Sequence, residues 1–427
     1  MEKVKATPTK EFFISMLTRD VPLDRAVLDL VDNSIDAAYL AGDIKNKTID
    51  IAINRDEFCI TDNCGGMDKE VAINYAFKFG RSKSDARDTP NSVGQFGVGM
   101  KRTLFKIGRQ FSVKSSHPNG SFIIDVDVDK WLEEPDDWDF SLVPTETEDA
   151  HGTSIKVTQL LEGVSQNFST ELFVKQILND IEKAHFKAIR KGVVIKVNGS
   201  KAGKYDISFK ASEFLQPICI VKEYNGVEYK IIAGVSERIL EDGGWYIICN
   251  GRLIEYANNN TKTGWGQAGI RKYHPDYAYF RGVVEFNAAE SELLPWTTTK
   301  TGVDVDNSVY RKALNDMKAA MKEVMSFLNK RQKEDEDFKN ELIEHKPLND
   351  ALDSAQIVGF EEVKINHSMV TPNTAIRQPD PDPSVSVQYR VKKKRIDRLK
   401  EALGLDTNKD VGVHTFEYVF EQEVGDE

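Results

Sequence analysis

Three polar residues near the start of the chain have a spacing that could bind a metal ion and activate water. Asp29, Asn33 and Asp36 follow one another at i, i+4 and i+7, so a helix would align two acids and one amide. The apolar residues of the same stretch also repeat at helical spacing: Leu23, Ala26, Val27, Leu30 and Val31. Taken alone, the polar line fits a solvated helix face better than a functional site. Its chemistry therefore depends on the elements placed beside it.

A strand that ends in a glycine turn supplies a second candidate group. Residues 60–67 have the sequence Ile-Thr-Asp-Asn-Cys-Gly-Gly-Met. The carboxylate of Asp62 could accept from an exocyclic amine, and the adjacent glycines would let a flat ring approach the backbone. The same pattern also fits an ordinary tight turn. A further Gly-Thr pair, Gly152 and Thr153, marks only the start of a strand when taken alone.

A third, glycine-rich segment covers residues 94–101, with the sequence Gly-Gln-Phe-Gly-Val-Gly-Met-Lys. Glycines that open a helix leave backbone N–H groups and the positive end of the helix dipole facing a phosphate. No Gly-Lys-Ser/Thr triplet of a Walker loop follows, and the parallel βαβ context of a dinucleotide fold is missing. As a single motif this segment is weak evidence.

The order of these four segments resembles the ATP-binding core of the GHKL superfamily over residues 12–160. That superfamily contains gyrase B, the ninety-kilodalton heat-shock chaperone, histidine kinases, and the MutL and MORC proteins. The resemblance implies an α+β fold: a Bergerat-type ATP-binding α/β sandwich, an S5-like transducer domain and a small C-terminal region. No histidine precedes Arg25, so the resemblance favours the MORC- and MutL-like members over a histidine kinase.

The resemblance also assigns roles on the helix. Asn33 would bind the Mg²⁺ ion that bridges the nucleotide phosphates. Asp29 would activate the attacking water, at a position where hydrolysing members carry glutamate. Its side chain is one methylene shorter, so slow hydrolysis is expected. Asp32 is the competing candidate, but it lies about 60° round the helix from Asp29.

For the nucleotide itself, Asp62 would accept from the adenine amino group, with Thr153 in the same network. Cys64 replaces the first glycine of the family pattern, and residues 80–93 resemble the ATP lid. Lys101 is either a phosphate ligand or a solvated lysine. The residues expected to bind ATP are Asn33, Asp36, Ala37, Asp62, Gly66, Met67, Gly94, Gln95, Phe96, Gly97, Val98, Gly99, Met100, Lys101 and Thr153.

A lysine beyond the ATP-binding core completes the predicted site. Residues 166–345 alternate helical and strand-like segments, as expected for the transducer. The helical patterns cover 170–189 and roughly 306–330, with a charged helical continuation over 331–344, and the strand-like runs cover 192–199, 217–222, 228–234, 244–249 and 279–286. In relatives with this domain, a loop lysine contacts the γ-phosphate, and Lys300 in loop 294–302 stands at the matching place. It would neutralise charge that develops on the γ-phosphate. The alternative is a solvated loop lysine.

The length and composition of the chain limit the number of domains and the classes of protein to which it can belong. The chain has 427 residues, 40% hydrophobic and 29% charged, which suits two or three domains. We place these at 1–165, 166–345 and 346–427, the last comprising a proline-containing linker and a small partner-binding region. No apolar run approaches the length of a membrane span, and no apolar signal core follows Met1. We therefore expect a cytoplasmic protein that does not associate with membranes and whose four cysteines are reduced.

These features predict a Mg-ATP-hydrolysing, ATP-gated dimeric clamp in a DNA-associated process such as repair, maintenance or defence. The net charge of −11 opposes broad phosphate-backbone binding. DNA contacts are therefore expected only at the lid (residues 80–93), the basic stretch 390–400 and the loop 258–277. The stretch 390–400 fits a charged, solvated helix equally well, and the loop fits a protein-binding role equally well. The alternative is a chaperone-like or scaffold ATPase with slow turnover, which binds a protein partner through residues 385–427.

Overall fold

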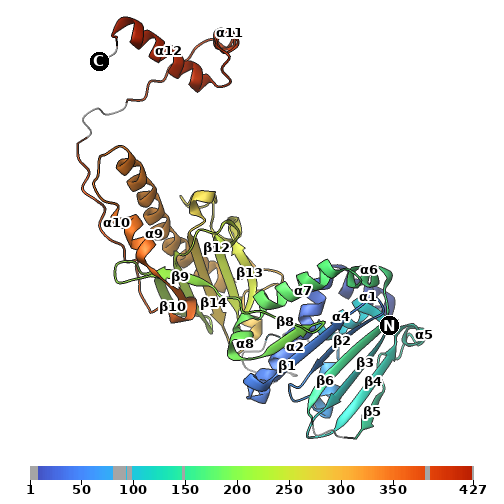
Figure 1. Cartoon of the computed structure of the whole chain (residues 1–427). Coiled ribbons are helices and arrows are strands. Elements are labelled where there is room, and N and C mark those ends of the chain that lie inside the picture. Colours follow the sequence, from blue (N-terminus) through green and yellow to red (C-terminus); the bar gives the residue numbers. More distant parts are fainter. Residues whose placement is uncertain (1–7, 80–92, 94–98, 147–149, 380–384, 426–427) are drawn as a thin grey trace, which may run out of the picture. The chain divides into compact units, whose positions relative to one another are not determined.

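The computed structural model describes residues 8–79, 93, 99–146, 150–379 and 385–425 (Figure 1). Two compact units divide the chain at residue 376. Within the first unit, one hydrophobic core lies in residues 8–202, which we call the N-terminal domain. Two further cores lie mainly in residues 203–376, which we call the second domain. None of the described helices is long and apolar enough to cross a membrane.

The N-terminal domain is built on an eight-stranded mixed sheet with the order β5-β4-β3-β6-β2-β1-β7-β8. Its strands are β1 (Thr48–Ile53), β2 (Glu57–Asp62), β3 (Gly108–Ser116), β4 (Ser121–Asp127), β5 (Leu142–Thr145), β6 (Gly152–Leu160), β7 (Val194–Val197) and β8 (Ser200–Lys201). Burial alternates along β1, where Ile49, Ile51 and Ile53 are buried and Asp50 is exposed. One face of the sheet therefore packs on helices while the other faces solvent.

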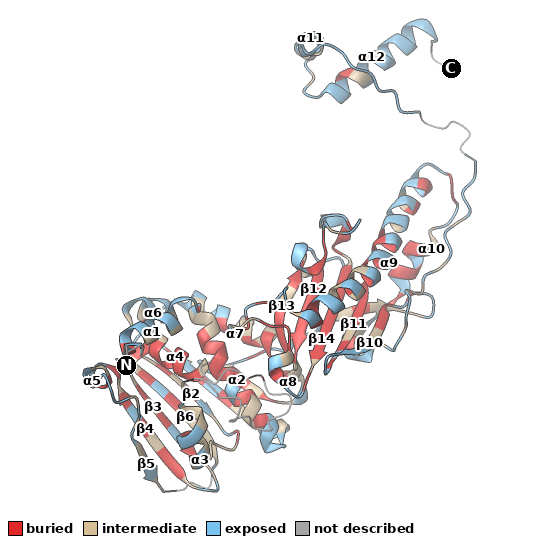
Figure 2. Cartoon of the chain, turned by 180° about the vertical axis from the view of Figure 1, so that it is seen from behind, coloured by how far each residue is buried: buried red, intermediate tan, exposed pale blue. Residues whose placement is uncertain are grey.

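Helices cover the buried face of this sheet (Figures 1 and 2). They are α1 (Lys10–Arg19), α2 (Leu23–Ala41), α4 (Gly99–Ile107), α6 (Glu162–Phe168), α7 (Glu171–Ala184) and α8 (Phe186–Lys191), with the short α3 (Lys69–Val71) and α5 (Val128–Glu133) at the edges. The first core joins the apolar side of α2 to the strands, as the repeat of Val27, Leu30 and Val31 predicts. The predicted α/β sandwich is confirmed.

The boundary between the first two domains differs from the one predicted at 165/166. Strand β7 pairs in parallel with β1, with Ile195 opposite Ile49, and α7 places Ile177 and Ile181 in the first core. The helical pattern 170–189 and the strand 192–199 are therefore present, but they complete the first sheet. A pattern of apolar residues shows that an element has a buried face without showing which core receives it.

The second domain contains a five-stranded sheet with the order β10-β11-β14-β12-β13 and a two-stranded sheet of β9 and β15. Its elements are β9 (Ser208–Ala211), β10 (Ile218–Tyr224), β11 (Val227–Val235), β12 (Gly244–Cys249), β13 (Arg252–Asn258), β14 (Phe280–Asn287), α9 (Ser308–Lys339), α10 (Pro347–Ser354) and β15 (Gln356–Gly359). Helix α9 packs on one face through Met317 and Met321, and Phe186 and Phe360 cover the other. The central strands are consequently buried on both faces.

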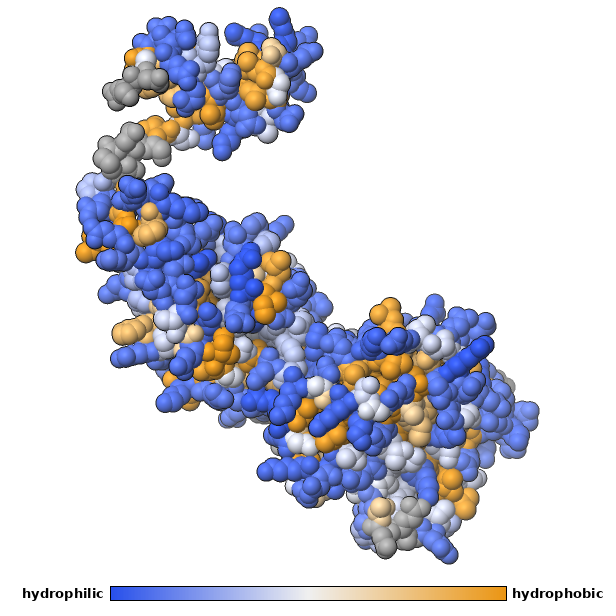
Figure 3. Space-filling view, viewed as in Figure 1, coloured by the Kyte–Doolittle hydropathy of each residue, from blue (hydrophilic) through white to orange (hydrophobic). Residues whose placement is uncertain are grey.

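The C-terminal end of the second domain also differs from the predicted boundary at 345/346. Helix α10 packs on α9 and adds Leu348 and Leu352 to the second core, and β15 pairs with β9. Both elements therefore belong to the second domain. The remaining unit, residues 377–427, contains α11 (Lys393–Leu403) and α12 (Asn408–Glu423). Figure 3 shows apolar side chains on its surface, where Phe416 and Phe420 are exposed.

Candidate functional site

Helix α2 carries the candidate acids and amide, and each has a different environment. The helix begins after Pro22 and ends at Gly42, whose φ of 80° lies in the left-handed region. Asp29 and Asp32 are 4% and 0% exposed. The side chain of Asn33 is exposed and makes no hydrogen bond to any described residue. The two acids are therefore engaged by neighbouring elements, while the amide lies where a ligand can reach it.

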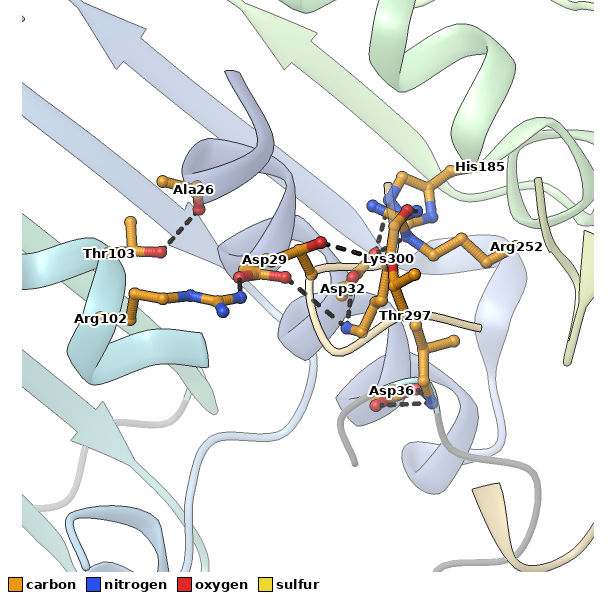
Figure 4. Close-up of polar contacts among 12 residues, drawn as sticks. Ala26, Asp29, Asp32, Asp36, Arg102, Thr103, His185, Arg252, Thr297 and Lys300 are labelled. Carbon is orange, nitrogen blue, oxygen red and sulfur yellow. Dashed lines mark hydrogen bonds and ion pairs between the residues drawn. The ribbon is translucent and has the colours of Figure 1, made fainter. Parts of the chain in front are cut away.

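Cations approach Asp29 from two directions (Figure 4). Arg102, in the first turn of α4, donates from Nη2 to Oδ2 of Asp29, and Nζ of Lys300 lies 3.7 Å from Oδ1. Gly99, the first residue of α4, is so close that a Cβ there would lie 3.5 Å from the Asp29 carboxylate carbon. The N-terminal turn of α4 and the Lys300 side chain thus meet at this one carboxylate.

Asp32 joins the two domains. Nε of Arg252 on β13 and Nζ of Lys300 each lie 2.6 Å from its carboxylate oxygens, and Nε2 of His185 lies 3.1 Å away. Burial alone would raise the pKa of Asp32, but the charges of Arg252 and Lys300 and the contact with His185 hold that pKa well below its usual range. Burial lowers the pKa of His185, which therefore favours its neutral form.

The loop before α9 presents Lys300 to these acids. Trp296 and Val303 pair across its base, and the Lys300 N–H donates to the carbonyl of Thr297 at 2.8 Å. Lys300 has a φ of 51° at the tip of this turn and is only 5% exposed. The side chain therefore leaves its own domain and ends against α2, so it is not a solvated loop lysine.

Beside Ser34, further along α2, the carboxylate of Asp62 lies in a hydrogen-bond network. Ser34 donates its hydroxyl to Oδ2 at 2.7 Å, while the backbone N–H groups of Cys64 and Thr153 donate to Oδ1 at 2.9 and 3.2 Å. Burial raises the pKa of Asp62, and these three donors oppose that rise. Such a carboxylate is fixed in orientation and can accept one more hydrogen bond from a ligand amine.

The turn after β2 requires its glycines at specific positions. Gly65 and Gly66 have φ values of 98° and 74°, and a Cβ on Gly66 would lie 1.9 Å from the carbonyl oxygen of Ser116. Cys64 does not have a positive φ, which explains why cysteine can replace the first glycine of the family pattern. Met67 is fixed by its N–H, which donates to the Ser115 hydroxyl at 2.6 Å.

Part of the predicted phosphate loop lies outside the described residues. This applies to Gly94, Gln95, Phe96, Gly97 and Val98, and to lid residues 80–92. Val93 between them is buried, and its N–H donates to both oxygens of Asp36 at 2.8 and 3.0 Å. Lys101 is buried as well, and its Nζ donates to the carbonyl of Ala76 at 2.7 Å. This lysine is therefore not solvated.

The remaining predicted residues fall into two groups around α2. Asp29, Lys300 and Gly99 meet at the middle of the helix, and Met100 is buried behind them. The second group consists of Asp62, at the end of β2, and three residues near it: Thr153, Gly66 and Met67. Asp36 and Ala37, both half-buried, follow Asn33 on the helix.

Sequence reasoning missed four residues of the site: Ser34, Arg102, His185 and Arg252. Ser34 follows Asn33 directly and Arg102 lies one turn inside a predicted helix, so both stood beside motif residues. His185 was assigned to a helical pattern of the other domain. Arg252 follows an Asn-Gly turn, and its ion pair with Asp32 spans 220 residues. No local signal could have paired these two.

The described residues suit a nucleotide with its metal better than a metal alone. No cluster of three His, Cys, Asp or Glu side chains that could hold an ion occurs in the described part of the chain. A Mg²⁺ ion bound beside Asn33 would therefore take most of its oxygen ligands from phosphates and water, the usual arrangement for magnesium. The opening of α4 next to Asp29 supplies backbone N–H groups for the same phosphates.

Comparison with known families agrees with this geometry. Residues 21–159 match the family described as Histidine kinase-, DNA gyrase B-, and HSP90-like ATPase. The matched range contains α2, the turn after β2, α4 and the start of β6. The N-terminal domain of this chain thus belongs to the GHKL-type ATPases, and the predicted superfamily is confirmed. None of the curated proteins matches the chain.

Proposed function

We propose that the protein binds Mg-ATP between α2, α4 and the turn after β2, and that it hydrolyses the nucleotide with groups from both domains. The observation that carries this proposal is the position of Lys300. This lysine belongs to the second domain, yet its ammonium group lies 3.7 Å from Asp29 on α2. A GHKL-type pocket with a buried cation from another domain is arranged to bind the terminal phosphate.

The proposed base-binding and phosphate-binding residues lie at two places along α2. Asp62 binds the adenine amino group, and Asn33 holds the metal ion, which supplies charge neutralisation on the phosphates. Lys300 binds the γ-phosphate. Asp29 accepts a proton from the attacking water, which requires that its pairing with Arg102 loosens, since a carboxylate paired with guanidinium is a weaker base. This pairing and the short aspartate side chain both favour slow turnover.

The biological step that we propose is an ATP-gated dimeric clamp of the MORC and MutL type, with the second domain as transducer. Support for DNA as its target comes from two basic regions. Residues 390–400 contribute to a helix with no buried residue, α11. In the loop 258–277, Trp265 is buried against the second core, while Arg271 and Lys272 remain exposed. Arg271 also lines a hollow of about 300 Å³ together with Lys322 and Lys330.

A chaperone-like or scaffold ATPase is the second candidate. The specific observation in its favour is the exposed apolar stripe on α12, where Val413, Phe416, Phe420 and Val424 recur at helical spacing. Such a stripe suits a protein partner better than DNA.

Sizing of the purified protein tests the clamp. We expect the apparent mass to double with a non-hydrolysable ATP analogue and Mg²⁺, and to remain monomeric with ADP. Asn33→Ala should remove this effect, and Asn167→Ala, an exposed asparagine on α6, should retain it. A target DNA should co-elute with the analogue-bound form at low salt and dissociate steeply as salt rises. An unchanged mass in all nucleotide states would contradict the clamp, and salt-independent retention would contradict DNA binding.

A further inference from the structure

Lys300 is held at two points, and Arg252 contributes to both. Nε of Arg252 donates to Oδ1 of Asp32, whose other oxygen binds the Lys300 ammonium group. Nη1 of the same arginine lies 3.4 Å from the backbone carbonyl oxygen of Lys300, at hydrogen-bond distance. One guanidinium group therefore fixes the Lys300 backbone directly and its side chain through Asp32.

Burial makes this arrangement depend on each of its members. Arg252 and Asp32 are 1% and 0% exposed, so water cannot replace a missing partner. Removal of one member of a buried ion pair leaves an uncompensated charge. A loss of Arg252 would remove one of the two lysine and arginine charges that face Asp32 in this cluster. The Lys300 ammonium group would then lose the fixed carboxylate that holds it near Asp29.

The backbone at Lys300 also needs support. A φ of 51° is left-handed and unfavourable for a residue with a side chain. Within the loop, the turn bond to Thr297 supports this conformation, and outside the loop the contact with Arg252 does so. Arg252 lies on β13, a strand of the second-domain sheet, and so transmits the rigidity of that sheet to the loop.

We propose that Arg252, acting through Asp32 and the Lys300 backbone, is a positioning residue that holds Lys300 in place for the γ-phosphate. This inference rests on the role proposed above for Lys300. Arg252 itself does not touch the nucleotide. It sets the place from which the Lys300 ammonium group can turn from Asp32 to a phosphate bound beside Asp29.

A double-mutant cycle separates positioning from general stability. The measured quantity is the ratio of the affinities for a non-hydrolysable ATP analogue and for ADP, because this ratio reports the γ-phosphate contact. We expect Lys300→Ala and Arg252→Gln each to lower the ratio by about 10-fold, the worth of one charge-assisted contact. In the double variant the ratio should fall no further, since both changes remove the same contact.

The control is a second buried arginine of the same domain. Arg281 on β14 is 4% exposed and bonds to the carbonyls of Ala278 and Phe280. Arg281→Gln should lower thermal stability and leave the affinity ratio unchanged. If Arg252→Gln does not fold, the same cycle is run with Asp32→Asn, which keeps the shape of the carboxylate and loses its charge.

Chemical labelling of Lys300 gives a readout that does not depend on nucleotide. With an amine-reactive reagent and mass spectrometry, Lys300 in full-length protein should label several-fold faster in Arg252→Gln than in the unmodified protein or in Arg281→Gln. The inference is overturned if Lys300 labelling is unchanged, or if the costs of Arg252→Gln and Lys300→Ala add. If Lys300→Ala leaves the affinity ratio intact, the proposed role of Lys300 fails first and the inference fails with it.

Discussion

In the proposed ATP site, the carboxylate of Asp62 is the group that would select the base. Its three donors leave room for one more hydrogen bond, and the bond from an adenine amino group fits an acceptor. Guanine presents a carbonyl oxygen at the same place, which the carboxylate would repel. We predict that the protein prefers ATP to GTP by at least about 10-fold and that Asp62→Asn reduces this preference, because an amide can also donate. Titration with both nucleotides measures the effect.

A matched control for Asp62→Asn is Asp127→Asn. Asp127 also accepts from a backbone N–H, at the first turn of α5, but lies at the end of β4 away from the turn after β2. The control should bind both nucleotides as the unmodified protein does. Equal affinity for ATP and GTP in the unmodified protein would refute the assignment of Asp62 to adenine.

Individual residues of the site were predictable where chemistry and local pattern coincide. Asp62 and Gly66 were selected because a strand ends there in a glycine turn. Lys300 was selected because its loop resembles the lysine-bearing loop of transducer domains. The partners of these residues were not predictable. Arg102 looks like any helix-start arginine, and its pairing with Asp29 depends on how α4 packs against α2. Ion pairs between elements distant in sequence are set by tertiary packing.

The turn between β2 and α3 provides a test at the level of one element. Gly66→Ala would place a Cβ 1.9 Å from the Ser116 carbonyl oxygen at a φ of 74°. We predict a loss of roughly 2 kcal/mol or more in the free energy of unfolding, from both the clash and the left-handed backbone. Denaturant unfolding monitored by circular dichroism measures this loss.

Gly65→Ala is the control for the same turn. Its φ of 98° is also left-handed, but its Cβ would meet only the Ala41 Cβ, at an ordinary 3.6 Å. The control should therefore lose less stability than Gly66→Ala, because only the backbone term applies. Equal losses would show that the close approach of β3 does not constrain this turn.

His185, which follows the last residue of α7, should make the stability of the fold depend on pH. His185 faces Asp32, Arg252 and Lys300, and burial lowers its folded-state pKa below the ordinary value. The unfolded chain then binds the proton first, so stability falls as pH drops below about 6.5, by at most about 1.4 kcal/mol per pH unit. Asp32 stays charged throughout this range because its pKa is well below normal.

We predict that His185→Gln removes this part of the pH dependence, since a glutamine side chain is polar but does not titrate. Thermal midpoints of the two proteins measured between pH 8 and 5 should differ by a constant amount above pH 7. Below about pH 6.5 the unmodified protein should lose stability faster than the variant. Parallel curves over the whole range would show that His185 contributes no linked protonation.

Elements were largely predictable, whereas their assignment to domains was not. The predicted strands 217–222, 228–234, 244–249 and 279–286 correspond to β10, β11, β12 and β14, and the predicted helix 306–330 and its charged continuation are both part of α9. Helix α7 and the β7–β8 hairpin were placed in the wrong domain, because parallel pairing of β7 with β1 joins residues about 146 apart. Such long-range pairing leaves no local sequence signature.

For the whole molecule, the division at residue 376 separates the proposed ATP site from the last 51 residues. All the described residues of this proposed site lie in the first unit. We predict that a chain ending at Ile376 hydrolyses ATP at the rate of the full chain but binds DNA more weakly and with a smaller salt dependence, because Lys392–Arg395 are removed. Filter binding at two salt concentrations and phosphate release measure the two properties. Loss of turnover in the shortened chain would contradict this division of roles.

The central claim is that α2 and the Lys300 loop together form an ATP-hydrolysing site. The most direct measurement is Mg²⁺-dependent phosphate release from ATP by the purified full-length protein, beside Asp29→Ala and Asn33→Ala. We predict slow turnover that falls at least about 100-fold in Asp29→Ala with ATP binding retained, and that is lost in Asn33→Ala together with Mg²⁺-dependent binding. Turnover that is unchanged in both variants would contradict the account.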